Sequence, residues 1–140
     1  MYKYYQIMSN KLISVITPCL NEEKNIPLIY SAIKSIFSEL TNYSYEHIFI
    51  DNKSSDNTRD ILKKLAKEDK NIKVIFNSRN YGQSASPYYA LQQSKGDAAI
   101  MIVADLQDPP ELIKDFIKEW EKGFKTVIGI KNKSKGNKLA

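Results

Sequence analysis

The chain alternates short runs rich in β-branched residues with longer segments whose apolar residues recur every three or four positions. The first pattern predicts strands and the second predicts helices. The expected strands lie at 12–17, 45–51, 72–76, 98–104 and 125–130, and the expected helices at 27–40, 57–65, 84–95 and 109–120. Strands and helices that alternate in this way favour right-handed crossovers and a parallel sheet. We therefore predict an α/β fold, with a mostly parallel sheet, helices on both faces, and an end after the fifth strand.

Two aspartates stand where predicted helices should begin. Asp56 precedes the second helix and Asp108 precedes the fourth, so both are predicted N-caps. At 140 residues the chain has room for one domain. We expect an N-terminal extension at 1–11, the folded domain at 12–130 and a basic tail at 131–140. The net charge of +5 suits an anionic ligand or an anionic membrane surface.

Several functional classes are excluded by residues that the sequence lacks. Cys19 is the only cysteine and His47 the only histidine, so neither an internal disulfide nor a four-ligand zinc site can form. His47 lies inside a predicted strand, where we expect it to be a packed residue, and we expect Cys19 to be packed in a turn. The glycine spacing of dinucleotide-binding enzymes, the P-loop and the G-x-S-x-G elbow are all missing. No nucleic-acid partner is expected, and no apolar run approaches the ~20 residues of a membrane span.

Acidic residues gather where the predicted strands end. In open parallel sheets, ligands bind outside the carboxyl ends of the strands. The four segments that follow strands here are 18–23, 51–56, 77–82 and 105–108, and three of them carry carboxylates. The candidate binding site is therefore this edge of the sheet.

The same segments resemble, in chain order, the motifs of the family 2 glycosyltransferases. The matching stretches are Ser14–Glu23, Ile50–Thr58, Asn80-Tyr81-Gly82 with Ala85 and Gly96-Asp97, and Ala104–Glu111. They are similar to the family's strand-P-x-[YF]-N-E-E, V-D-[DN]-x-S-x-D-x-T, N-x-G…A…G-D and A-D-L-Q-D-P-P-E patterns. The resemblance covers residues 12–130. It is greatest to the branch that uses polyprenyl-phosphate acceptors, such as dolichol-phosphate mannose synthases.

The resemblance implies a GT-A fold and an inverting transferase that takes its sugar from a nucleotide-diphospho-sugar. A UDP-sugar is the expected donor, and a lipid phosphate or a polysaccharide is the expected acceptor. The implied location is the cytoplasm, with peripheral contact at the inner face of the membrane as an open alternative. The donor-binding residues implied are Pro18, Asn21, Glu22, Asp51, Arg79 and Asp105. The motifs single out no catalytic base.

The metal implied is Mg²⁺ or Mn²⁺, held by Asp105 and Gln107, whose hard oxygen ligands suit such ions. Asp51 would accept the N3–H of uracil, with a turn cap as the alternative role. Arg79 and Lys131 would meet phosphates, with solvated surface as the alternative. Asn21 and Glu22 would reach the ribose or the base, unless they are only polar residues at a helix start.

Two positions depart from the family pattern. Val103 replaces the first aspartate of the usual D-x-D, and Leu20 replaces an aromatic residue. The implied catalytic domain is also longer than this chain, so we interpret the sequence as the donor-binding half of a transferase. A non-catalytic nucleotide-binding or interaction domain is the alternative. A nucleotidyltransferase is disfavoured because the loop at 19–23 is acidic and lacks glycine.

Overall fold

The computed structural model describes residues 10–131. Its elements, in chain order, are β1 (Lys11–Cys19), α1 (Ile26–Glu39), β2 (Tyr43–Asp51), α2 (Thr58–Glu68), β3 (Ile72–Phe76), α3 (Gly82–Gln93), β4 (Ala98–Met101) and α4 (Leu112–Glu121). The predicted extension at 1–11 and tail at 131–140 lie almost wholly outside the described residues, so these two boundaries stay predictions.

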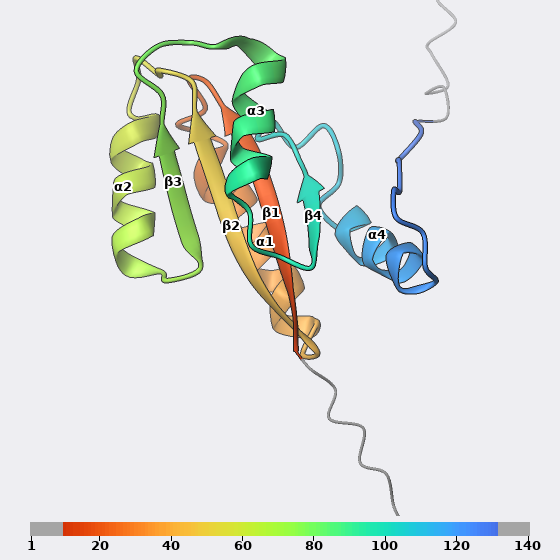
Figure 1. Cartoon of the computed structure of the whole chain (residues 1–140). Helices are drawn as coiled ribbons and strands as arrows, with labels where there is room; N and C mark the ends of the chain where they lie inside the picture. Colours follow the sequence, from red (N-terminus) through yellow and green to blue (C-terminus); the bar gives the residue numbers. More distant parts are fainter. Residues whose placement is uncertain (1–9, 132–140) are drawn as a thin grey trace, which may run out of the picture.

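The four strands form one sheet in the order β3-β2-β1-β4, and every neighbouring pair is parallel. Figure 1 shows the sheet with β3 and β4 as its two edge strands. Cys19 lies beside Asp51, and Asp51 lies beside Phe76. The loops that follow β1, β2 and β3 therefore leave the sheet on the same side, at the carboxyl ends of the strands. The predicted parallel α/β fold is confirmed.

Helices cover both faces of the sheet. Helix α1 buries Ile26, Ile29 and Ile33, whose spacing of three and four places them on one side of the helix. They share a core with residues of α2 and α4 and with strand residues such as Val15 and Phe49. Helix α3 covers the opposite face, where Ala90 joins a smaller cluster of strand isoleucines. In Figure 1, α3 crosses in front of β1 and α1 lies behind it.

The predicted fifth strand at 125–130 is wrong. Residues 124–131 follow α4 without forming helix or strand, and Ile128 and Ile130 are 77% and 84% exposed. A β-rich composition favours a strand only where a partner strand can complete the hydrogen bonds. A cavity separates this segment from the free side of β4. The segment consequently has no partner among residues 10–131.

Strand β4 and helix α4 are both shorter than predicted. Strand β4 ends at Met101 instead of 104, and the chain turns at Ala104 and Asp105. Helix α4 begins at Leu112, after a turn in which the Leu112 N–H donates to the Pro109 carbonyl (3.1 Å). A residue followed by proline is disfavoured in the helical region, which delays the helix at Pro109-Pro110.

Neither predicted aspartate cap is the N-cap of its helix. The N-cap of α4 is Glu111, and Asp108 instead forms an ion pair with Lys131 (2.8 Å). The N-cap of α2 is Asn57, one residue after the predicted Asp56. Asp56 still accepts a hydrogen bond from the first helical N–H, that of Thr58 (2.9 Å). The predicted boundary of α2 is thus close, while that of α4 is displaced by the two prolines.

Candidate functional site

Hydrogen bonds join the loops that follow β1 and β2. Asn21 donates its N–H to Ser54 Oγ and accepts the Ser55 N–H at Oδ1, both at 2.8 Å. The next residue, Glu22, donates its N–H to Thr58 Oγ1, also at 2.8 Å. Asn21 has φ 54°, a left-handed conformation that asparagine tolerates better than most residues. Asn21 and Glu22 therefore fix the shape of the candidate site, and a contact with donor remains a prediction for both.

Asp51 is fully buried at the end of β2 and is surrounded by donors. The Arg59 Nε lies 2.5 Å from Asp51 Oδ2, and the N–H groups of Lys53 and Ser54 lie 3.2 Å from the same oxygen. The Arg59 Nη2 also donates to the Asn77 carbonyl (2.6 Å), which follows β3. Asp51 thus makes the contacts of a turn cap, which is the alternative role that the sequence analysis gave for this residue. Arg59 ties the ends of β2 and β3 together.

The sequence analysis singled out neither Asn52 nor Arg59. Asn52 lies within the matching stretch Ile50–Thr58, and Arg59 is the residue directly after it. The Asn52 Nδ2 donates to the Gly82 carbonyl, and its Oδ1 accepts from Asn77 Nδ2 and the Tyr81 N–H, all at 3.0 Å. Asn52 therefore holds the loop between β3 and α3 against β2. A basic residue in the first turn of the helix that follows a strand-end aspartate could have indicated Arg59. No sequence signal indicated the partners of Asn52.

Arg79 lies on the part of this loop that faces solvent. Its guanidinium stands 4.7 Å from the centre of the Tyr81 ring, and its side chain is exposed. The structure therefore leaves Arg79 available to an anion but does not bring it into contact with Asp51. A cavity of about 450 Å³ lies beside the loop, with Phe76, Tyr81 and Tyr89 among its lining residues.

Asp105 and Gln107 lie on one exposed turn after β4. Asp105 Oδ1 accepts the Gln107 N–H (3.1 Å), and Leu106 between them has φ 59°. Both side chains are exposed, so their oxygens are accessible from solvent. Within residues 10–131, no cluster of three or more histidine, cysteine or acidic residues could hold a metal ion. The protein offers an incomplete ligand set here, which fits an ion that takes most of its ligands from phosphate and water.

Three further residues of the sequence prediction have defined places. Pro18 lies half-buried in β1 beside Ile50 and has no side-chain polar group. Lys131 forms an ion pair with Asp108, which is not one of the predicted donor-binding residues. Cys19 is buried at the end of β1, and this burial, followed by the nearby Asp51 charge, raises the pKa of its thiol. Cys19 is therefore a packed residue and not a nucleophile.

The carboxylate of Asp56 also belongs to the joined loops. Besides its bond to Thr58, it accepts the Glu23 N–H at 3.3 Å. Partial burial works to raise the pKa of Asp56, but the hydrogen bonds from Thr58 and Glu23 outweigh it and lower the pKa. A lowered pKa keeps this carboxylate charged, and a charged acceptor binds the two loops more strongly.

Comparisons with known proteins match this arrangement to one family. The model of the family "Glycosyl transferase family 2" matches residues 14–139. The chain is 39% identical over 126 residues to the putative glycosyltransferase CsbB of Bacillus subtilis, covering 90% of this chain and 38% of that protein. It is 37% identical over 116 residues to the bactoprenol glucosyl transferase of Shigella phage SfV, covering 83% of this chain and 38% of that protein. The chain thus spans well under half the length of these relatives.

A solved structure has the same fold. Residues 1–349 of S. aureus TarS in complex with UDP superpose with a TM-score of 0.59 and 27% identity, covering 76% of this chain and 32% of TarS 1–349. The helices within residues 10–131 are all too short or too polar to cross a bilayer.

Proposed function

Because the chain belongs to glycosyl transferase family 2, we propose that residues 12–130 bind a UDP-sugar as the donor-binding part of an inverting glycosyltransferase. The observation that carries the proposal is that Asn21, Asp51 and Asp105 lie at or just after the carboxyl ends of three adjacent parallel strands. This is where open α/β sheets bind nucleotides. The UDP in the TarS complex supports a uridine nucleotide as the ligand.

In this proposal the nucleoside end of the donor lies near Asp51. The Arg59 guanidinium and the Ser54 N–H hold the Asp51 carboxylate in one orientation. Asp51 is fully buried, so one oxygen of this oriented carboxylate would have to become exposed on donor binding before it could accept the N3–H of uracil. Pro18 near the end of β1, and Asn21 and Glu22 in the loop after it, would contact the ribose or the base.

The diphosphate end would lie near the turn after β4. Asp105 and Gln107 would hold Mg²⁺ or Mn²⁺, and such an ion neutralises the charge that develops on a leaving diphosphate. Arg79 would add a positive charge from the loop after β3, where its guanidinium is exposed. Val103 supplies no ligand at the position where the family pattern has an aspartate, so we expect weak metal binding in the absence of nucleotide.

The proposed acceptor is a polyprenyl-phosphate lipid at the cytoplasmic face of the membrane. Bactoprenol appears in the name of the phage SfV relative, which supports a prenyl acceptor over a polysaccharide. A phosphate monoester has a second pKa near 6 and is mostly ionised at pH 7. Such an acceptor would need no strong base, in keeping with motifs that single out none. The net charge of +5 also suits an anionic membrane surface.

Val103 specifically favours the second candidate function, a domain that binds the nucleotide without catalysing transfer. Both candidates predict UDP binding, and only the first predicts that a protein containing this domain transfers sugar to polyprenyl phosphate. A radiolabelled UDP-sugar assay on the longer relative CsbB carrying the valine at its equivalent position separates them. Loss of transfer with retained UDP binding would favour the second.

The proposal is tested by calorimetric titration of the chain with UDP, with and without Mn²⁺. We expect tighter binding with Mn²⁺. Asp105→Asn should remove most of that difference, since a lost charge-assisted contact costs about 1–3 kcal/mol. Asp108→Asn is the matched control: it lies on the same loop and pairs with Lys131. Equal UDP affinity with and without Mn²⁺, or equal effects of the two substitutions, would overturn the proposed metal site.

A further inference from the structure

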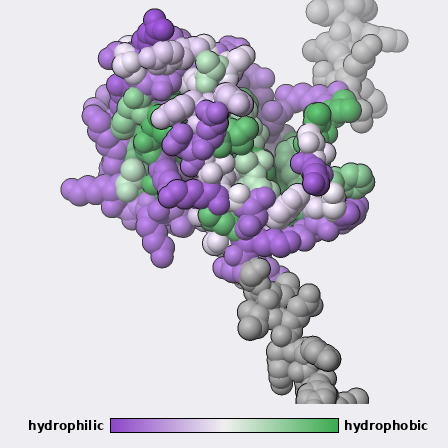
Figure 2. Space-filling model, in the orientation of Figure 1, coloured by the Kyte–Doolittle hydropathy of each residue, from purple (hydrophilic) through white to green (hydrophobic). Residues whose placement is uncertain are grey.

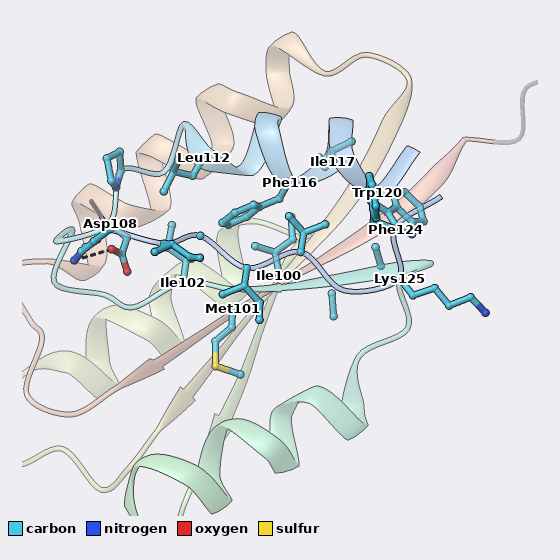
Figure 3. Close-up of a pocket in the computed structure, with 18 of the residues that line it drawn as sticks. Ile100, Met101, Ile102, Asp108, Leu112, Phe116, Ile117, Trp120, Phe124 and Lys125 are labelled. Carbon is cyan, nitrogen blue, oxygen red and sulfur yellow. Dashed lines mark ion pairs between the residues drawn. The ribbon is translucent and has the colours of Figure 1, made fainter. Parts of the chain in front are cut away.

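The two edge strands of the sheet have different surroundings. Beside β4, a cavity of about 700 Å³ has α4 and the segment 124–131 of the same chain as its other walls. Figure 3 shows Ile100 and Phe116 directed into that cavity from opposite sides. At the other edge, β3 pairs with β2 on one side and, in the described part of the chain, with no strand on the other. The outer edge of β3 therefore has unpaired backbone groups.

The hydrogen bonds of β3 show which groups these are. The Asn71 carbonyl accepts an N–H from β2 (2.8 Å), and the Asn77 N–H donates to a carbonyl of β2 (2.9 Å). In a parallel ladder, every second residue of a strand bonds to the same neighbouring strand. Odd-numbered residues of β3 therefore face β2, and Val74 and Phe76 direct their N–H and C=O groups away from it. Such groups readily pair with another extended chain.

A groove lies beside this edge, on the face of the sheet that α3 covers. It is the cavity of about 450 Å³ described above, and Ile75, Tyr81, Ala85 and Tyr89 are among its lining residues. We call it the β3 groove. In Figure 2, hydrophobic surface is visible where Figure 1 shows β3, and hydrophilic surface borders it over α2. The β3 groove thus offers an apolar surface to side chains of a strand added at this edge.

Positive charges lie on the other face of the same edge. Arg59, Lys63 and Lys67 are four residues apart in α2, which places them along one side of the helix. The Arg59 guanidinium and the Lys63 Nζ lie 5.2 Å and 5.8 Å from the centre of the ring of Phe76, the last residue of β3. Lys63 also lies 3.7 Å from Asp60, in an exposed ion pair that water weakens. This row of charges favours an anionic partner.

We propose that β3 takes an extended acidic segment of a partner protein as an added strand. The backbone of that segment would bond to Val74 and Phe76. Because side chains alternate between the two faces of a strand, one set would enter the β3 groove and the next would face Lys63 and Lys67. The segment that fits therefore alternates apolar with acidic residues. In strand addition, main-chain bonds supply affinity and the contacts of alternate side chains supply selectivity.

A second copy of the chain and a membrane fit this edge less well. A second copy that paired β3 with β3 would bring two rows of positive charge together, which is unfavourable. An anionic bilayer would attract the lysines, but its headgroups cannot form a ladder with Val74 and Phe76. The proposal does not depend on donor binding, because neither the lining residues of the β3 groove nor the two lysines are among the predicted donor-binding residues.

The test adds a synthetic peptide in which glutamate alternates with valine to the ¹⁵N-labelled 140-residue chain. Hydrogen exchange at single backbone amides is the readout, since pairing protects amides from exchange. We expect exchange at Val74 and Phe76 to slow about ten-fold or more. Lys73 and Ile75 should change little, because their N–H groups already face β2. A peptide in which lysine alternates with valine is the control and should leave all four amides unchanged.

Charge reversal separates the lysines of this edge from general attraction to a basic protein. Lys63→Glu combined with Lys67→Glu should weaken binding of the glutamate peptide by about ten-fold. Lys64→Glu combined with Lys118→Glu is the matched control. It changes the net charge equally, and both lysines are exposed outside the row in α2.

Three results would overturn the proposal. One is unchanged exchange at Val74 and Phe76 with the glutamate peptide while the spectrum stays that of a folded chain. Another is equal weakening of peptide binding by the two double substitutions. The third is slower exchange at Val74 and Phe76 without peptide, caused by phosphatidylglycerol vesicles or by a higher concentration of the chain, which would assign the edge to a membrane or a second copy. UDP titration of the same samples shows separately whether the donor site is intact.

Discussion

At the residue scale, the buried Asp51 carboxylate has the Arg59 guanidinium as its charged partner. Breaking a buried ion pair from one side leaves a charge without compensation, at a cost of about 3–5 kcal/mol. Because the Arg59 side chain is 24% exposed, water can reach the site. We therefore predict that Arg59→Ala lowers the free energy of unfolding by about 2–3 kcal/mol, which is less than the cost of breaking a pair that water cannot reach. Urea denaturation measures this loss.

Arg79→Ala is the control for this prediction, since Arg79 is exposed on the next loop. A surface substitution of this kind changes stability by about 0.5 kcal/mol or less. Arg59→Lys should give an intermediate loss, because lysine keeps the charge but not the fork that reaches both Asp51 and the Asn77 carbonyl. Equal losses for Arg59→Ala and Arg79→Ala would show that Arg59 does not tie the strand ends together.

His47 gives a pH-dependent prediction. It is fully buried in β2, its Nε2 lies 2.9 Å from Thr17 Oγ1, and burial lowers its pKa from 6.5 to about 3. Between pH 6.5 and about 3, the unfolded chain binds a proton at His47 that the folded chain does not. Stability therefore falls as the pH falls through this window, by up to about 1.4 kcal/mol per pH unit.

The measurement is the free energy of unfolding of the parent and of His47→Gln from pH 7 to pH 4.5. Glutamine has no proton to gain, so the variant should lose less stability on acidification. Glu46 and Asp69 also have lowered pKa values, and their contribution is lost at lower pH in both proteins. Parallel stability curves for the two proteins would contradict the account of His47, which the sequence predicted only as a packed residue.

At the scale of elements, the turn between α3 and β4 presses closely on β1. A Cβ on Gly96 would lie 2.6 Å from Ser14 Oγ and 2.7 Å from the Ser14 N and the Ala98 carbonyl. Two of these atoms belong to the backbone, so they cannot move aside without shifting a strand. Gly96→Ala should destabilise the chain by about 1–3 kcal/mol, as overpacking does.

Lys95→Ala is the matched control at the preceding residue, where the side chain is exposed and the N–H that donates to Glu46 is retained. Thermal unfolding followed by circular dichroism compares the two variants. A melting temperature for Gly96→Ala that equals that of Lys95→Ala would contradict the close packing of this turn.

The elements also show what a single sequence can predict. The spacing of Ile29, Ile33 and Ile36 predicts α1 because one helix face is buried, and that burial is a local property of the sequence. The segment 125–130 was predicted as a strand on equally local grounds and is not one. Strand formation depends on a partner that may lie anywhere in the chain, and local composition contains no information about that partner.

At the scale of the whole molecule, parallel strands bring motifs that are far apart in sequence together at the edge formed by the carboxyl ends of the strands. The sequence predicted this edge as the site because alternation of strands and helices determines where strand ends meet. It could not predict that Arg59 and Asn52 join the loops, since these contacts depend on side-chain geometry between elements. The same limit applies to Asp108 and Lys131, whose pairing follows from where the chain runs after α4.

The most direct test of the central claim is to map UDP binding on the ¹⁵N-labelled chain by NMR in the presence of Mg²⁺. The account predicts that the largest shifts of backbone amides fall at 19–23, 51–56 and 105–108, at the carboxyl ends of β1 and β2 and in the loops after β1, β2 and β4. Titration without Mg²⁺ should keep the shifts at 51–56 and lose those at 105–108. Shifts confined to 98–101 and 124–131, or no shifts with a well-folded spectrum, would contradict it.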